Sequence, residues 1–174
     1  MAEIRSIGLK YIKIGDPEQD GGMGQTLAAL GVTYQDTAEL TREDPEITNI
    51  NSEENDDPEE VIETPGARRI RWSIMNVDPV EVAKIMGGTS DGDIYKAPDA
   101  AAPVEKSIEI LTKTNLLIQI PRVKLYAKEN FQFRKKNVLL IDIEGTVLKP
   151  NKENEPTILW QKVTGDGEPS PSAS

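Results

Sequence analysis

Two carboxylates in the last third of the chain form its strongest catalytic pattern. Asp142 lies within the apolar run 140–143, and Glu144 follows that run directly before Gly145 and Thr146. In phosphoryl transfer, a first carboxylate attacks phosphorus, a second acts as acid and base, and Mg²⁺ bridges the reacting groups. The spacing therefore makes metal-dependent phosphoryl transfer the first hypothesis to weigh.

This arrangement resembles the nucleophile motif of haloacid-dehalogenase-type phosphatases, in which an apolar strand ends in Asp-x-Asp-Gly-Thr. Those enzymes need a Rossmann-like sheet after the motif to supply further acidic ligands and a lysine. Few residues follow Leu148 in this chain of 174, and many of them have turn composition. We therefore interpret Asp142 and Glu144 as the solvent face of a strand whose inner face is Ile141 and Ile143.

Other ligand-binding patterns are incomplete. The glycine-rich stretch 21–26 lacks the Lys before Ser/Thr of a phosphate loop, so a flexible loop is the better interpretation. The acids at 91–93 and 51–57 do not follow the twelve-residue Ca²⁺-binding loop with its final Glu. The chain has no histidine, the commonest general base and metal ligand. We expect no enzymatic activity, no metal and no cofactor.

Composition narrows the class of protein further. A length of 174 residues suits one domain, and the absence of cysteine fits a reducing cytoplasm. The chain contains no run of about 18 to 20 apolar residues that would form a membrane helix, so we expect no membrane partner.

Charge is unevenly distributed. The segment 43–63 contains ten carboxylates and no Lys or Arg, whereas 122–136 is predominantly basic. These segments either form two solvated faces or meet, within one subunit or between subunits. The basic segment also holds Phe131 and Phe133, a pattern compatible with a stacking platform for nucleic acid. The net charge of −10 argues against such binding, and we assign both phenylalanines to the core.

The segment 68–88 predicts a strand followed by a short helix. Ile70, Trp72 and Ile74 alternate with polar residues over 68–74. Asp78 can cap a helix over 79–86, and Gly87 can end it. The helix should pack through its apolar stripe of Val82, Ile85 and Met86.

Most of the remaining ordered segments read as strands. Pro121 should mark a sheet edge or a bulge, and the basic strand beside it is the edge expected to pair with a neighbouring subunit in an assembly. We expect a mainly β fold, an antiparallel β-sandwich or partly closed barrel with one short flanking helix, over residues 1–164, and a disordered tail at 165–174. Strands are predicted at 4–14, 32–40, 46–52, 107–112, 116–120, 122–126, 138–148 and 157–163, a helical turn is conceivable at 26–31, and loops are predicted at 51–58 and 89–103.

Taken in order, these segments resemble the tail tube (major tail) proteins of long-tailed bacteriophages. The resemblance is carried by the acidic mid-chain segment, by 67–74, by 78–88 and by the closing strands at 138–150 and after Pro156. It implies subunits joined edge to edge into hexameric rings that stack into a tube for DNA ejection. Carboxylates facing the lumen would let the duplex slide without tight binding.

The resemblance also implies partners and site residues. Besides other copies of itself, the protein would contact the tape measure and tail-terminator proteins, within a virion tail assembled in the host cytoplasm. The segment 49–64 would reach the adjacent ring, and the basic residues would face a neighbour's acidic segment. The inter-ring candidates are Glu53, Glu54, Asp56, Asp57, Glu59 and Glu60, and the subunit-edge candidates are Arg122, Lys124, Lys128, Arg134, Lys135 and Lys136.

Two alternatives remain open. A tube-forming component of a bacterial secretion or contractile injection machine would have the same pattern. A monomeric β-sandwich binding module, for example for carbohydrate, would need an exposed aromatic platform, and the chain has only two Trp, four Tyr and two Phe.

Overall fold

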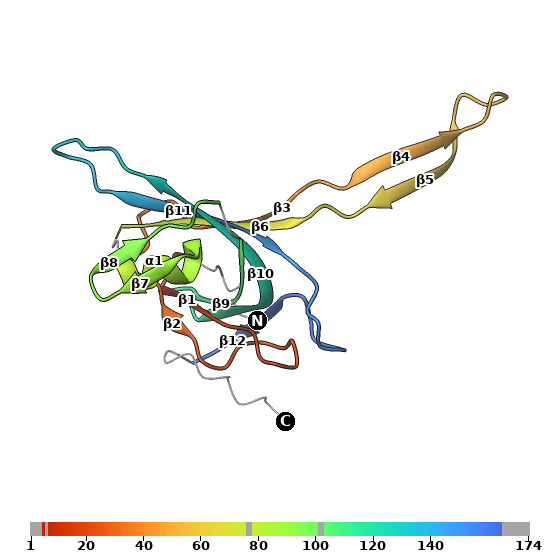
Figure 1. Ribbon diagram of the computed structural model, residues 1–174. Coiled ribbons are helices and arrows are strands. Elements are labelled where there is room, and N and C mark those ends of the chain that lie inside the picture. The colour runs from red at the N-terminus through yellow and green to blue at the C-terminus, as the bar shows by residue number, and fades with distance from the viewer. Residues whose placement is uncertain (1–4, 6, 76–77, 101–102, 165–174) are drawn as a thin grey trace.

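The protein is mainly β and contains one helix in the part of the chain that the structure describes (Figure 1). The computed structural model describes residue 5 and residues 7–75, 78–100 and 103–164. The elements are β1 Tyr11–Gly15, β2 Ala28–Ala29, β3 Glu39–Arg42, β4 Glu46–Asn51, β5 Pro58–Thr64, β6 Arg68–Ile74, α1 Pro79–Met86, β7 Thr89–Asp91, β8 Ile94–Lys96, β9 Val104–Leu111, β10 Leu116–Asn130, β11 Leu140–Val147 and β12 Leu159–Lys162.

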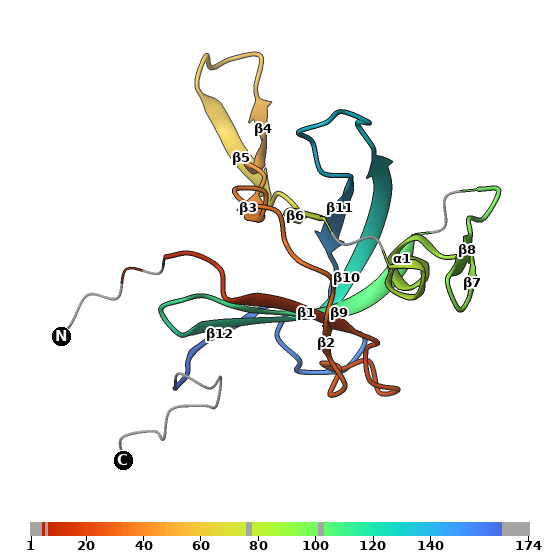
Figure 2. The same cartoon turned by 90° about the vertical axis from the view of Figure 1, so that its left-hand side faces the viewer.

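One large antiparallel sheet forms the body, in the order β2-β1-β9-β10-β11-β6-β3, with β12 also paired to β10. Strand β10 is 15 residues long and joins the two halves of the sheet. Its first part pairs with β9 and β12, and its later part pairs with β9 and β11. The sheet consequently bends along β10 so that its halves face each other, as Figure 2 shows. The expected antiparallel β fold with one short helix is confirmed.

The core lies between these halves and consists of alternating residues from facing strands. Ile70, Trp72 and Ile74 of β6 are all buried, which confirms the predicted inner face of that strand. Ile141 and Ile143 of β11 are buried in the same way. Because the side-chain period of a strand is two, the polar residues between them point to the opposite face.

Helix α1 forms as predicted. The Asp78 side chain accepts a hydrogen bond from the Val80 amide at 2.9 Å, and Gly87 ends the helix with a φ of 73°. A positive φ of this kind favours glycine. Val82 and Ile85 are buried and Met86 is packed against the core, so the helix covers part of β9 and β10. No helix in the described residues is long and apolar enough to span a bilayer.

Several sequence-based boundaries need correction. The segment 89–103, predicted to be a loop, contains the β7–β8 hairpin, and 26–31 contains the short strand β2 instead of a helical turn. Within 32–40, regular pairing begins only at Glu39, apart from a bridge between Thr33 and Ile74. The strand expected over 4–14 forms at Tyr11–Gly15, and residues 1–4 and 6 and the tail at 165–174 lie outside the described residues.

The predicted sheet edge at 122–126 is wrong. Residues 123–125 lie in the middle of β10 and have β9 on one side and β11 on the other. Pro121 is accommodated by a bulge: the pairing between β9 and β10 shifts register between Ile120 and Val123. The Pro121 carbonyl accepts a hydrogen bond from the buried Ser107 hydroxyl at 2.6 Å. The backbone at 123–125 is therefore already paired on both sides within the subunit. From Tyr126 to Asn130, which includes Lys128, β10 pairs only with β11 among the described strands.

Candidate interaction surfaces

The predicted inter-ring segment forms a β-hairpin that projects away from the body (Figures 1 and 2). Strands β4 and β5 pair from Glu46↔Thr64 to Asn51↔Pro58, and the turn between them contains the predicted mobile loop. Every residue of the two strands is exposed. In the described structure neither strand contacts any other helix or strand. We call residues 46–64 the acidic hairpin.

The acidic hairpin exposes apolar side chains on both of its faces. The pairing of Asn49 with Val61 places Ile47 and Val61 on one face, and the pairing of Thr48 with Ile62 places Ile50 and Ile62 on the other. These four side chains are exposed by 57%, 49%, 44% and 46%, respectively. An isolated two-stranded hairpin is marginally stable in water. Exposed apolar residues without a covering layer are typical of a surface that binds another chain.

Carboxylates surround these apolar residues. The six inter-ring candidates all lie in β5 or in the turn that precedes it, and each is exposed. At the turn, Glu59 accepts hydrogen bonds from Ser52 Oγ at 3.1 Å and Asn55 Nδ2 at 3.0 Å. The Asn55 bond, followed by the Ser52 bond, lowers the pKa of Glu59. At the base of the hairpin, Arg69 pairs with Glu43.

A second hairpin extension lies between β10 and β11. Residues 131–138 are all exposed, including Phe133 at 84% and Phe131 at 36%. The two rings meet edge to face with their centroids 6.3 Å apart. The prediction that they belong to the core is wrong, because they lie beyond the last residue pair of the β10–β11 ladder, Asn130↔Leu140, where no layer covers them. We call residues 131–139 the basic tip.

The predicted cations divide into two groups. Arg122 makes a two-pronged contact with Glu105, at 2.9 Å for each nitrogen–oxygen pair, and this contact lowers the pKa of Glu105. Lys124 lies opposite Glu105 in the sheet, and Lys128 lies opposite Asp142. Neither lysine forms an ion pair with a described residue, and the same holds for the exposed side chains of Arg134, Lys135 and Lys136 in the basic tip. The tip cations differ in lying beyond the β10–β11 ladder, with no carboxylate opposite them in the sheet.

The structure separates the acidic and basic candidate residues within one subunit. The acidic hairpin extends from one side of the body and the basic tip from the opposite side (Figure 1). Sequence reasoning recognised the charge of both segments but missed the exposure of their apolar residues. The signal was the weak periodicity of 46–52, where isoleucines fall on both faces of the strand and no single inner face exists.

The carboxylate pair lies on the outer face of β11, as predicted. Asp142 accepts hydrogen bonds from Ser73 Oγ and, at 2.9 Å, from Asn130 Nδ2. Glu144 pairs with Arg71 at 3.1 Å and with Arg69 at 3.4 Å. Among the described residues no group of three or more Asp or Glu side chains is placed to hold a metal ion. The contacts that the structure gives this pair thus link β11 to β6 and β10.

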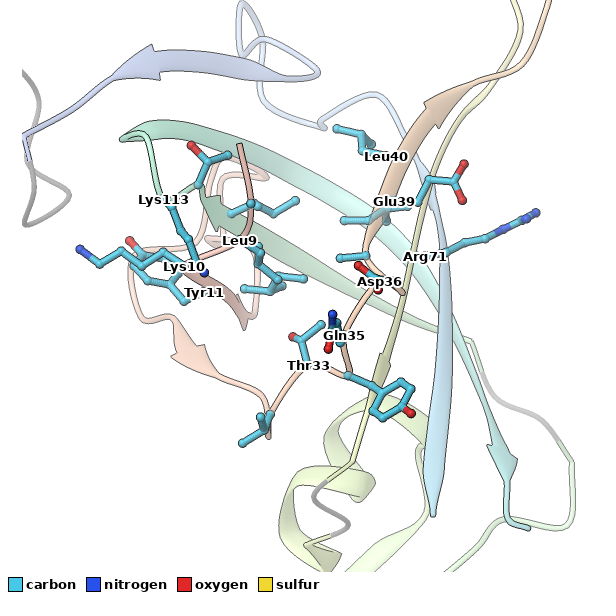
Figure 3. A pocket seen from close by; sticks show the side chains of 18 of the residues that line it. Leu9, Lys10, Tyr11, Thr33, Gln35, Asp36, Glu39, Leu40, Arg71 and Lys113 are labelled. Atoms are coloured by element: carbon cyan, nitrogen blue, oxygen red, sulfur yellow. The ribbon is translucent and has the colours of Figure 1, made fainter. Parts of the chain in front are cut away.

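A cavity of about 910 Å³ opens where the two halves of the sheet do not meet. Its lining includes the core residues Ile12, Ile70 and Ile110. Figure 3 shows charged side chains around it, with Lys10 and Lys113 on one side and Asp36, Glu39 and Arg71 on the other. An apolar interior with a charged rim can accept a hydrophobic ligand or a segment of another chain.

In comparisons with known proteins, no protein-family model and no curated protein matches this chain.

Proposed function

We propose that the protein is a structural subunit that polymerises into stacked rings and forms the tail tube of a long-tailed bacteriophage. The observation that carries this proposal is the acidic hairpin, whose two strands are exposed at every residue and contact no other helix or strand of the described subunit. It occupies the segment that the resemblance assigns to contacts with the adjacent ring.

Energetics support a partner for this hairpin. Full burial of an Ile or Val side chain stabilises a protein by about 1.5 to 3 kcal/mol. Ile47, Ile50, Val61 and Ile62 remain about half exposed, so each has roughly 1 kcal/mol still to gain. A protein that functions as a monomer would leave this stabilisation unused and would carry an aggregation risk on a long exposed ribbon. A polymer would bury the same surface at each contact.

The charge distribution supports the conduit role. A net charge of −10, repeated in every subunit, would give the tube a negative field that repels phosphate and allows a DNA duplex to pass without being held. Such a role needs no catalytic step. It needs a rigid β body, which the single bent sheet provides, and contacts between copies.

A tube subunit of a secretion or contractile injection machine is supported by the same features. A monomeric binding module is the second candidate, and the cavity of about 910 Å³ is the observation that favours it. That cavity is bordered by aliphatic and charged residues, with Tyr11 and Tyr34 as its only aromatic lining residues in the described part of the chain. This composition suits an apolar ligand better than a stacked sugar.

Negative-stain electron microscopy of the purified protein, across concentration and salt, tests the proposal. Rings or hollow tubes are the expected result, and they would leave only the choice between phage and secretion machine. Small monodisperse particles under every condition would argue against self-assembly. In that case, saturable binding of a small apolar probe, lost on Leu9→Asp substitution in the cavity, would favour the binding module.

A further inference from the structure

We propose that the acidic hairpin of one subunit docks on the basic tip of another subunit. This inference rests on the proposed function, because it names the contact through which the copies assemble. It specifies which basic residues of 122–136 contact the hairpin of a neighbouring copy. The sequence alone did not distinguish among them.

The basic residues of 122–136 differ in whether a carboxylate of the same sheet already lies opposite them. Arg122 is held by Glu105, and Lys124 and Lys128 lie across from carboxylates of their own sheet. Both lysines are exposed and form no ion pair with a described residue, but each has a carboxylate opposite it in the sheet. Of the six predicted cations, only the three of the basic tip lie beyond the ladder, and they too are exposed without an ion pair to a described residue. The tip therefore has an unused positive charge that suits a partner rich in carboxylates.

The basic tip and the acidic hairpin both expose apolar side chains. The tip exposes Phe131, Phe133 and Val138, the last at 46%. The acidic hairpin exposes Ile47 and Val61 on one face and Ile50 and Ile62 on the other. Aromatic rings packed on β-branched side chains are favourable across paired strands. Charge would orient the two surfaces and accelerate their encounter, and apolar burial would provide most of the affinity.

The hairpin and the tip project from opposite sides of the same subunit (Figure 1), so they do not meet within it. Because the two patches lie on opposite sides, one neighbouring copy does not engage both at once, so the contact is heterologous. Repetition of such a contact produces a closed ring or an open helical filament, not a two-fold dimer. The inferred contact is thus of the kind that builds a polymer.

Charge reversal on each side tests the contact in the full-length protein. The tip variant is Arg134→Glu, Lys135→Glu, Lys136→Glu, and the hairpin variant is Glu53→Lys, Glu54→Lys, Asp56→Lys, which leaves Glu59 and its turn contacts in place. Sedimentation velocity measures assembly, and circular dichroism checks that each variant folds. Each variant alone should need about tenfold or more protein to assemble than the unmodified chain. An equal mixture should regain assembly. The unchanged acidic hairpin of the tip variant then faces the unchanged basic tip of the hairpin variant, and the hairpin variant's turn, now basic at 53–56, faces the acidic tip.

A matched control reverses three exposed cations elsewhere, Lys84→Glu, Lys96→Glu and Lys149→Glu. It makes the same change in net charge and should not disturb assembly beyond the general effect of charge. If it weakens assembly as much as the tip variant does, the effect is nonspecific repulsion and the inference is wrong. If the tip variant assembles normally while the unmodified chain forms tubes, the inference fails and the proposed function stands.

Cross-linking separates the remaining outcomes, because the native chain has no cysteine. Copies carrying Asn55→Cys are mixed at high concentration with copies carrying Gln132→Cys and treated with a short bis-maleimide. A 55–132 cross-link without rings would support the contact and count against the tube. No cross-link and no self-association at any concentration would overturn both proposals. A tip variant that loses affinity for duplex DNA or anionic vesicles, yet assembles normally, would assign the tip to that ligand instead.

Discussion

Gly145 of β11 lies directly opposite Leu125 of β10, and a Cβ atom added to Gly145 would come within 2.8 Å of a Leu125 methyl carbon. The same Cβ would lie 2.6 Å from Val123 Cγ1 and 3.0 Å from Ile70 Cγ2. Three core side chains from two neighbouring strands thus occupy the space beside this glycine. The Glu-Gly-Thr pattern at 144–146 resembles part of a phosphatase motif. The close packing beside Gly145 explains why the pattern contains a glycine.

Substitution of Gly145 by Ala should therefore destabilise the fold. Overpacking of a close-packed core costs about 1 to 3 kcal/mol, and we expect a loss of this size in the free energy of unfolding, measured by urea denaturation. Thr146→Ala, at the next position on the half-exposed outer face, is the control and should cost less. Equal stability of the Gly145→Ala variant and the native chain would show that the two strands separate more easily than this packing implies.

Arg122 should contribute to the subunit and not to assembly. Its guanidinium holds both oxygens of Glu105 and also reaches the Lys149 carbonyl and Asn151 Oδ1. A lysine cannot reproduce this planar geometry, so Arg122→Lys should lower Tm slightly and leave sedimentation of the assembled form unchanged. Reduced assembly with an unchanged Tm would restore Arg122 as an intersubunit residue.

The effect of Arg122→Lys on stability should depend on pH in a defined direction. Because Arg122 lowers the pKa of Glu105 below its ordinary value of 4.5, the ion pair stabilises the folded state above that pH. Its contribution is lost as the pH falls through the lowered folded-state pKa. The difference in Tm between the variant and the native chain should accordingly shrink in acid.

The sequence correctly predicted the elements whose periodicity, start and end are determined by neighbouring residues. The strand β6 alternates strictly, and α1 carries its own cap at Asp78 and its own stop at Gly87. The continuity of β10 could not be predicted, because a proline usually interrupts a ladder. Here a bulge and the Ser107 hydroxyl accommodate it. Both depend on the pairing of β10 with the preceding strand β9, which the residues next to Pro121 do not reveal. Strand β5 was missed because its acid-rich sequence has little strand propensity apart from Val61 and Ile62.

The candidate surfaces were predictable in charge but not in exposure. Alternation at Phe131 and Phe133 suggests one buried face, yet burial depends on whether another layer covers that face. The ladder ends at Asn130↔Leu140, so the phenylalanines extend beyond the sheet. The residues near such a point do not show where two paired strands extend beyond the rest of the sheet.

The hydroxyl group of Tyr11 should lose its proton at an unusually high pH. Burial, then the hydrogen bond from its hydroxyl to Glu109 at 2.9 Å and the charge of that carboxylate, raise its pKa from 10.0 to about 12. The unfolded chain loses this proton at lower pH than the folded chain, so stability falls between these two values as the pH rises. Tyr11→Phe should reduce that alkaline loss. Tyrosinate absorbance against pH, compared with the variant, measures the pKa directly, and a single group titration near 10 for all four tyrosines would contradict the assignment.

The apolar residues of the acidic hairpin should matter only to assembly. Ile47→Thr with Ile62→Thr alters one side chain on each face while keeping residues that favour strands. Because both positions are exposed, we expect the free energy of unfolding of the free subunit to change by about 0.5 kcal/mol or less. Assembly, measured by sedimentation, should weaken clearly. Ile94→Thr, at an exposed position of β8, is the control, and equal effects from both variants would indicate general surface hydrophobicity rather than a specific contact.

Proteolysis should report directly on whether the acidic hairpin is covered. The turn between β4 and β5 contains Glu53 and Glu54, both exposed and distant from the body. A protease that cleaves after glutamate should therefore cut the free subunit there first. In assembled tubes the hairpin would lie against a neighbour, and the cut should slow strongly while cleavage at exposed Glu153 continues. Both sites are followed in the same digest, so a general loss of protease access would slow both cuts and can be recognised. If the hairpin is cut equally fast in tubes, it has no role in stacking.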